Sequence, residues 1–391
     1  MYFSFDFKSS MLLIFVLHAA VFSMLLLSKA IQNEHKPSYW LSAFIFFSGL
    51  YISPFMLGYA GWYSRQPYRD ILFYFPFQQL FLLPPVLYIY VKTLLDESFT
   101  FNPRHFLHFL PWFGYFVYSL IVFVTDKAVL DYAYFYADGM DKDFSSWYQI
   151  TGFISLATYS ILCLRSYFTY KELSLQTVSF ADAIMFGWIK RFLIALLMIL
   201  ILRGLFFILN PEWDQFGKKF WYYLSFSILV YYISISGYVN AIQSIFTLKT
   251  ASVLAVSSPI NEQEESQLLK TASFIDIDIE PWKNKLEALM INEKIYENPT
   301  LTLVDVAQQM ETSPKRVSQI INQGYEMNFN DFVNLYRTLA VIEQIKSGNH
   351  SLLTLLAIAF ECGFNSKSTF NRAFKKHTKL TPKEYLSQNY Y

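Results

Sequence analysis

The stretch ECGFNSKSTFNRAFKKHT, residues 361–378, carries the pattern that decides the fold of the C-terminal part of the chain. Four apolar or small residues lead into it at the i, i+3, i+4, i+7 spacing of one helix face: Leu355, Ile358, Ala359 and Cys362. Gly363 then suits a tight turn, and Ser366 is a good N-cap for the next helix. We therefore predict two short helices joined by a turn.

The second of these helices has two distinct faces. Its apolar face holds Phe370, Ala373, Phe374 and His377. Its other face and the residues flanking it are polar or cationic: Asn365, Ser366, Lys367, Ser368, Asn371, Arg372, Lys375 and Lys376. This is the pattern of a helix-turn-helix motif, whose second helix offers hydrogen-bonding and cationic side chains to the bases and phosphates of DNA.

The same pattern occurs earlier in the chain. Leu303, Val306, Ala307 and Met310 repeat the four-point stripe, and Glu311 and Thr312 form the turn. Ser313 is the expected N-cap and Pro314 suits the first helical position. The following helix buries Val317, Ile320 and Ile321, and its candidate DNA-contacting residues are Ser313, Lys315, Arg316, Ser318, Gln319 and Asn322.

A longer helix, from Asn330 to about Lys346, joins the two motifs, with Phe332, Leu335, Tyr336, Leu339 and Ile342 expected on its apolar side. The two caps, Ser313 and Ser366, are 53 residues apart. Two reading helices on such a connector can enter successive turns of the major groove, about 34 Å apart.

Charge supports this interpretation. From Ser313 onward the chain has ten Lys/Arg and five Asp/Glu, whereas its net charge as a whole is only +1. Phosphate contacts of such cations supply affinity, and groove-facing polar residues supply sequence choice. A single exposed lysine is as readily an ordinary solvated charge, Cys362 is a small core residue, and His377 lies at the core edge. The doubled pattern, and no single residue, therefore carries the prediction.

Three stretches resemble the AraC/XylS family of transcription regulators: NDFVNLYR (330–337), ECGFNSKSTFNRAFKKHT (361–378) and LTPKEY (380–385). The resemblance covers roughly Trp282–Tyr385 and implies reading helices at Ser313–Asn322 and Ser366–His377. One departure is Lys379, where the family usually has glycine; lysine there either strains the turn or adds a phosphate contact. The resemblance to membrane-anchored members implies a bacterial protein of the inner membrane that binds promoter DNA and contacts RNA polymerase.

The first 246 residues have the composition of a membrane domain. The chain is 54% hydrophobic and 16% charged, against about 25% charged in soluble domains. A spanning helix needs about 20 mostly apolar residues. Seven stretches qualify: Ser10–Ser28, Tyr39–Tyr59, Ile71–Val91, Phe106–Val124, Ile150–Phe168, Ile189–Leu209 and Phe220–Ile242. The first has no cleavage site of the signal-peptide kind, so we interpret it as a span. Pro84 and Pro85 should kink or break the third.

Seven spans place the termini on opposite sides of the membrane. Because the C-terminal part must face DNA in the cytoplasm, the N-terminus is expected outside, although Lys/Arg counts in the loops do not discriminate. The loop at 125–147 is either a short external sensing surface or a merely solvated loop, and holds Asp126, Asp131, Asp138, Asp141 and Asp143. Arg203, within the sixth span, is a sensor candidate; snorkelling or a structural partner is the alternative.

The expected fold is all-α: a seven-helix transmembrane bundle (1–246), a polar linker (247–280) and a soluble double helix-turn-helix domain (281–391). Cys163 and Cys362 are not expected to pair, and no catalytic, cofactor or metal site is indicated. We therefore hypothesise a membrane-embedded, one-component transcription factor, with a homodimer and an unknown ligand or membrane signal as partners. The alternatives are a transporter or enzyme with a regulatory DNA-binding tail, release of the C-terminal part by proteolysis, and a protein-interaction module.

Overall fold

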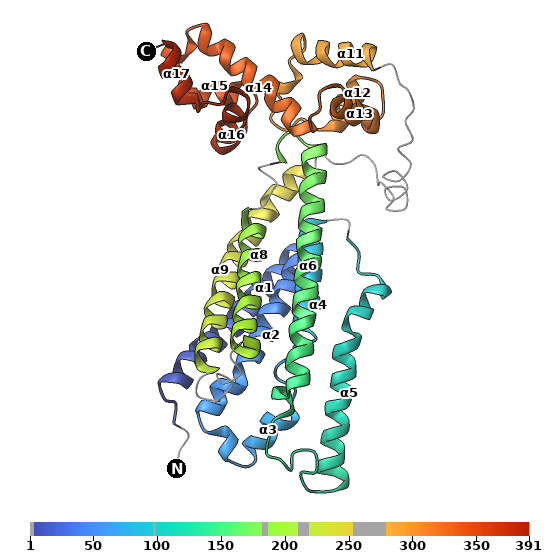
Figure 1. The fold of residues 1–391 in the computed structure, drawn as a ribbon, viewed down its shortest axis with the longest axis vertical. Coiled ribbons are helices and arrows are strands. Elements are labelled where there is room, and N and C mark those ends of the chain that lie inside the picture. The colour runs from blue at the N-terminus through green and yellow to red at the C-terminus, as the bar shows by residue number, and fades with distance from the viewer. Residues whose placement is uncertain (1–3, 97–98, 182–186, 210–218, 253–278, 391) are drawn as a thin grey trace. The chain divides into compact units, whose positions relative to one another are not determined.

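A computed structural model describes residues 4–96, 99–181, 187–209, 219–252 and 279–390. These residues form helices and turns, with one isolated antiparallel bridge between Val178 and Thr302, so the all-α prediction is confirmed for them. The chain divides into two compact units (Figure 1). The first comprises residues 1–167 and 187–257, and the second comprises residues 168–186 and 258–391.

The first unit is built of long apolar helices. In chain order its elements are α1 (Phe7–Asn33), α2 (Lys36–Tyr59), η1 (Trp62–Ser64), α3 (Tyr68–Tyr74), α4 (Leu83–Leu95), η2 (Pro103–Phe109), α5 (Leu110–Val124), η3 (Thr125–Val129), η4 (Lys142–Phe144), α6 (Ser146–Thr177), α8 (Gly187–Gly204), η5 (Leu205–Leu209) and α9 (Lys219–Ser252). Residues of α6 from Phe168 onward belong to the second unit.

Five helices among the described residues are long and apolar enough to cross a membrane: Phe7–Asn33, Lys36–Tyr59, Pro103–Val129, Ser146–Thr177 and Lys219–Ala241. The sixth predicted span is a helix of 18 residues, α8, followed by the π-turn η5. Length and composition thus support several spanning helices without reproducing the count of seven.

The third predicted span is not one helix. The chain leaves helical geometry after Tyr74, at the end of α3, and resumes it at Leu83, where α4 begins. Of the two predicted outcomes, a kink or a break, the break is observed, and Pro84 and Pro85 lie in the first turn of the helix that follows it. In that turn the N–H groups have no partner inside the helix, so proline costs nothing there.

Close packing of small residues holds α1 against α2. A Cβ added at Gly49 would lie 3.0 Å from the Cβ of Ala19, which shows how near the two backbones run. Beside this contact the Ser42 hydroxyl donates to the Ser23 carbonyl oxygen at 2.7 Å. Small and hydroxylated residues are the usual contacts between helices in an apolar surrounding, where hydrophobic attraction between helices is weak.

The second unit places two helix pairs at the ends of one longer helix. Its elements are the end of α6, α11 (Glu280–Ile291), η7 (Ile295–Glu297), α12 (Leu303–Gln309), α13 (Pro314–Gly324), α14 (Phe329–Lys346), η8 (Asn349–Ser351), α15 (Leu355–Glu361), α16 (Lys367–Thr378) and α17 (Pro382–Tyr390). One apolar core joins α11, α12 and α13 to the start of α14, and a second joins α15 and α16 to its end.

The apolar side of α14 differs from the one predicted. Phe332 is buried, but Leu339 is 51% exposed and Leu335, Tyr336 and Ile342 are only partly buried. The buried face instead includes Asn330, Asn334, Arg337, Thr338, Val341 and Ile345. Four polar residues therefore lie on the inner face, a placement that hydrophobic periodicity alone could not reveal.

The join between the two units was expected at 247–280. Helix α9 continues through Ser252, and residues 253–278 lie outside the described part of the chain. No composition change in the sequence separates residues 168–186 from the membrane half, yet this segment clusters with the C-terminal unit.

Candidate nucleic-acid interface

Helix α13 presents the first predicted reading face. The Ser313 hydroxyl caps it by accepting the Arg316 N–H at 3.3 Å, and Pro314 occupies its first turn. Val317, Ile320 and Ile321 are buried against α12, as predicted. Lys315 and Asn322 are exposed, whereas Ser318 and Gln319 are partly exposed on the same stripe. The capped helix thus turns four predicted side chains toward solvent on one face.

Arg316 departs from this pattern. Its guanidinium lies 4.9 Å from the ring centre of Trp282 on α11, a cation–π contact. The side chain is therefore held by the neighbouring helix instead of extending from α13 with Lys315. Arg316 therefore helps to pack α11 against α13, and it also adds positive charge near the reading face.

Helix α16 presents the second reading face. Ser366 caps it by accepting the Thr369 N–H at 3.1 Å. Phe370, Ala373 and Phe374 are buried as predicted, and His377 is partly buried at the edge of the core. The remaining predicted residues are exposed: Asn365, Lys367, Ser368, Asn371, Arg372, Lys375 and Lys376.

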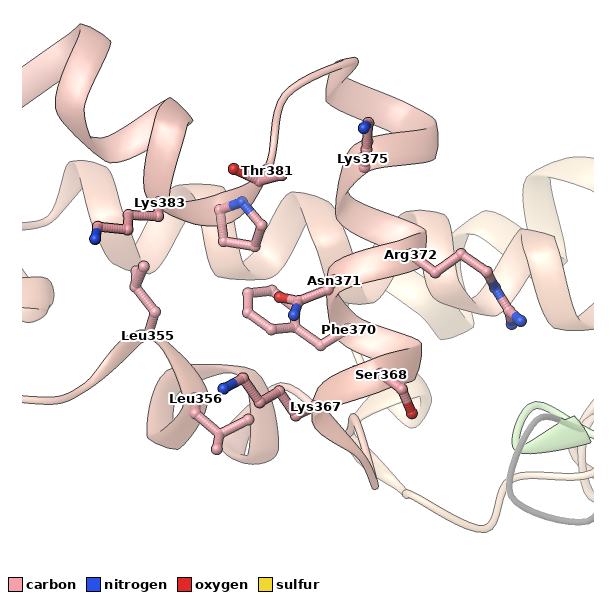
Figure 2. A pocket seen from close by; sticks show the side chains of 11 residues that line it. Leu355, Leu356, Lys367, Ser368, Phe370, Asn371, Arg372, Lys375, Thr381 and Lys383 are labelled. Atoms are coloured by element: carbon pink, nitrogen blue, oxygen red, sulfur yellow. The ribbon is translucent and has the colours of Figure 1, made fainter. Parts of the chain in front are cut away.

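A groove of about 550 Å³ runs between α16 and the starts of α15 and α17 (Figure 2). Figure 2 shows Lys367 and Asn371 on α16, with Lys383 of α17 across the groove and Arg372 extending the opposite way. Its lining holds four cationic residues and no carboxylate among the described residues: Lys367, Arg372, Lys375 and Lys383. A concave surface with this charge suits a phosphate backbone.

Partial burial lowers the pKa of Arg372, because the charged guanidinium loses water near apolar neighbours. Arginine stays protonated in proteins, so this side chain still adds positive charge to the exposed face of α16.

Lys376 faces elsewhere. Its ammonium group forms an ion pair at 2.6 Å with Asp331, near the start of α14. The side chain thus ties α16 to α14, and this predicted DNA-contacting lysine already has an acidic partner. Sequence spacing places Lys375 and Lys376 together, but only the fold separates their roles.

The comparisons with known proteins bear on this surface. Residues 306–388 match a family described as a helix-turn-helix domain. The matched family is of the AraC type, and the match runs from α12 to α17. No curated protein sequence and no solved structure matches the chain. Residues 306–388 therefore form a helix-turn-helix domain of the AraC type, which supports DNA as the partner of this part of the chain.

Two residues of the AraC-type domain add to what the sequence predicted. Lys383 lines the groove, although it follows the predicted motif and was counted only as charge. Lys379 ends α16 with φ +67°, in the left-handed region that favours glycine. The predicted strain at that turn is therefore present, because lysine carries a Cβ in a conformation that disfavours one.

Arg203, the sensor candidate, is 4% exposed, and the structure thus favours a structural partner over snorkelling. Its Nη2 donates to Gln149 Oε1 at 2.8 Å, and its Nη1 donates to the Tyr51 hydroxyl at 3.3 Å. Its buried Nε has no hydrogen-bond partner within the described residues. A small cavity adjoins the guanidinium and is lined by Tyr51, Tyr222 and apolar side chains.

The acidic loop at 125–147 is solvated only in part, with Asp131 and Asp138 exposed and the other three acids buried. Asp126, Asp141 and Asp143 are buried, and each accepts a tyrosine hydroxyl. Tyr115 donates to Asp143 at 2.5 Å and Tyr63 to Asp141 at 3.1 Å. Burial raises the pKa of both Asp141 and Asp143. Three of the five acids thus fold inward and serve the packing of the first unit.

Both cysteines are free and buried. Cys362 lies in the core formed by α15 and α16, in agreement with its assignment as a small core residue.

Proposed function

We propose that the chain is a membrane-anchored transcription regulator that reads promoter DNA through two helix-turn-helix motifs, α12–α13 and α15–α16. The observation that carries the proposal is the pair of capped helices, α13 and α16, whose polar faces are exposed and whose apolar faces complete separate cores. The AraC-type match supports DNA as the partner.

We assign phosphate contacts and base contacts to different side chains. Lys367, Lys375 and Lys383 contact phosphates and supply affinity that weakens with salt. Asn371 and Ser368 on α16, with Gln319 and Asn322 on α13, reach base edges in the major groove. An asparagine or glutamine amide pairs in bidentate fashion with adenine, and such a contact is worth roughly 1–3 kcal/mol of discrimination.

The long apolar helices of the first unit support a membrane anchor. We propose that this is the bacterial inner membrane, with the N-terminus outside and the DNA-binding domain in the cytoplasm. In this proposal the first unit senses a ligand or a state of the bilayer, and Arg203 is its candidate recognition group. The regulator acts as a dimer in contact with RNA polymerase, and the signal shifts the population between competent and incompetent arrangements. No enzyme chemistry is assigned to it.

The test is genome-wide DNA crosslinking of the full-length protein in cell membranes. We expect discrete peaks for the wild type and their loss in Asn371→Ala/Arg372→Ala. The matched control is Lys346→Ala, which removes an exposed cation from the last turn of α14 and should keep the peaks. Peaks that survive in the double variant would overturn the assignment of α16 as a reading helix.

A blot of the same cells addresses two of the alternatives, proteolytic release and a protein-interaction module. Peaks that accompany only a shorter soluble fragment would favour proteolytic release over action from the membrane. Absence of peaks in all variants, with the protein intact in the membrane, would favour a protein-interaction module.

A further inference from the structure

Residues Val178–Ala181 follow α6 and lie inside the second unit. Ser179 and Ala181 are fully buried there, although the sequence places them in a loop of the membrane half. DNA recognition by α13 and α16 does not require this burial against the AraC-type domain, so it calls for a role of its own.

The backbone of this segment pairs with the residues that lead into α12. The Ser179 N–H donates to the Leu301 carbonyl oxygen at 3.0 Å, and Val178 forms an antiparallel bridge with Thr302. The Asn330 side-chain amide donates to the Ser179 carbonyl oxygen at 2.9 Å. The segment is thus held from two sides, by the strand-like stretch before α12 and by the inner face of α14.

Arg337 makes the contact specific. Its Nη2 donates to the Ser179 hydroxyl at 3.0 Å, and its Nη1 donates to the Ser179 carbonyl oxygen at 3.3 Å. The same guanidinium donates to the carbonyl oxygens of Tyr296 at 2.8 Å and Asn298 at 2.7 Å. All of these acceptors are neutral.

A buried cation with neutral acceptors depends on every one of them. Arg337 is 1% exposed, and burial lowers its pKa to about 10, so it remains charged at neutral pH. Without Ser179, its outward face would need water in place of two protein acceptors. Water can supply acceptors in their place, so release of the segment need not leave the guanidinium without hydrogen bonds.

The segment docks where the two helix pairs meet. Arg337 lies in the middle of α14, between the two cores. The turn of the second pair approaches the same place, because a Cβ added at Gly363 would lie 2.3 Å from the Tyr296 carbonyl oxygen. Whatever moves residues 296–302 or the centre of α14 therefore bears on how the two reading helices are spaced.

We propose that residues 178–181 are a docking segment whose binding site is the junction formed by Tyr296–Thr302 and the Asn330–Arg337 face of α14. Its docking or release sets the spacing of the two reading helices. The contact itself does not depend on the proposed function. Only its effect on DNA recognition rests on that function. The segment follows α6 directly, and α6 begins in the first unit at Ser146, so a change in that helix has a covalent route to the junction.

A reversible disulfide tests the contact in the full-length protein. Bridge partners in antiparallel pairs have Cα atoms about 4.5–5.5 Å apart, within the range that a disulfide spans. We expect Val178→Cys/Thr302→Cys to crosslink in membranes under mild oxidation, while each single variant does not. Adding Ser179→Trp, which cannot fit the buried site, should abolish the crosslink; Glu172→Trp, on an exposed position near the end of α6, should not. Failure of the double variant to crosslink above the single variants would overturn the docking.

The oxidised and reduced forms of the same double variant then test the coupling. Thr302 also caps α12, where its hydroxyl accepts the Asp305 N–H at 3.2 Å. Loss of this cap is common to both forms and cancels. We expect affinity for a two-site operator to differ about fivefold or more between them, the usual lower bound for coupled sites. Equal affinities would overturn the coupling. If neither form nor the wild type binds DNA, the proposed function fails, while the crosslink still decides the docking.

Discussion

Lys379 is a residue with a Cβ in the left-handed conformation that ends α16. It closes α16 with φ +67°, and its N–H donates to the Lys375 carbonyl oxygen at 2.9 Å. A left-handed conformation costs a residue with a Cβ about 1–2 kcal/mol, which glycine avoids at some cost in unfolded-state entropy.

We expect Lys379→Gly to stabilise the AraC-type domain by up to about 1 kcal/mol. Hydrogen exchange of α16 and α17 peptides in the full-length protein measures this. Lys379→Ala is the control, because it removes the charge and keeps the strain. A gain of equal size in both variants would mean that charge, not backbone conformation, limits stability at this position.

Gly363 and Gly348 are two glycines in left-handed conformations that differ in their surroundings. Both have positive φ, +90° and +82°, but a Cβ at Gly363 would collide with backbone atoms of Tyr296 and Glu297, while none lies near Gly348. We expect Gly363→Ala to cost roughly 3 kcal/mol or more and Gly348→Ala about 1 kcal/mol. Thermal unfolding of the full-length variants checks the order. Equal losses would show that strain alone, and not contact between the helix pairs, fixes Gly363.

At this scale the sequence predicted the features that depend on local rules. Ser313 and Ser366 cap their helices as expected, since a cap depends only on residues within one turn. The buried role of Arg337 was not predictable in the same way. An arginine on a helix is ordinarily solvated, and its acceptors come from Ser179 and Tyr296, which are distant in sequence.

Among the elements, apolar content located the long helices but did not fix their number, and the Pro84-Pro85 pair indicated the one break. The stretch Ile71–Val91 satisfies the composition of a span, yet it divides into α3 and α4. The segment between them supplies buried polar contacts that composition does not show. The Gln78 N–H donates to Asp143 at 3.1 Å, and the Leu80 N–H donates to the Tyr148 hydroxyl at 3.1 Å.

The pairing of α1 with α2 leads to a prediction about packing. We expect Gly49→Ile to destabilise the first unit by about 1–3 kcal/mol, because the larger side chain would press on Ala19. Gly114→Ile in α5 is the matched control, since no atom lies within 4 Å of its added Cβ. Thermal unfolding in detergent micelles measures both. A loss in the control as large as in Gly49→Ile would point to general effects of isoleucine instead.

In the whole molecule, the division into two units follows the division of composition, except at residues 168–186. The sequence separates the first half by its apolar composition and the C-terminal part by its helix-turn-helix spacing. Residues 168–186 could not be assigned to the C-terminal unit in this way, because the pairing of Val178 with Thr302 joins segments more than a hundred residues apart. Such pairing leaves no local signal.

The buried Asp143 of the first unit gives its stability a pH dependence of definite sign. Asp143 accepts from Tyr115 and from the Gln78 N–H, and burial raises its pKa to about 6. The unfolded chain ionises this group near pH 4. Between those values the folded state holds more protons than the unfolded state, so stability falls as the pH rises through the window.

We expect the unfolding temperature of the full-length protein in detergent to fall between about pH 4 and pH 6, and Asp143→Asn to flatten that fall, because asparagine has no proton to lose. Asp138→Asn is the control. Hydrogen bonding to Lys142 lowers the pKa of Asp138, so its contribution has the opposite sign and its removal cannot flatten the fall. An unchanged slope in Asp143→Asn would mean that this carboxyl is already ionised across the window, and that the tyrosine hydroxyls and backbone N–H groups around it outweigh its burial.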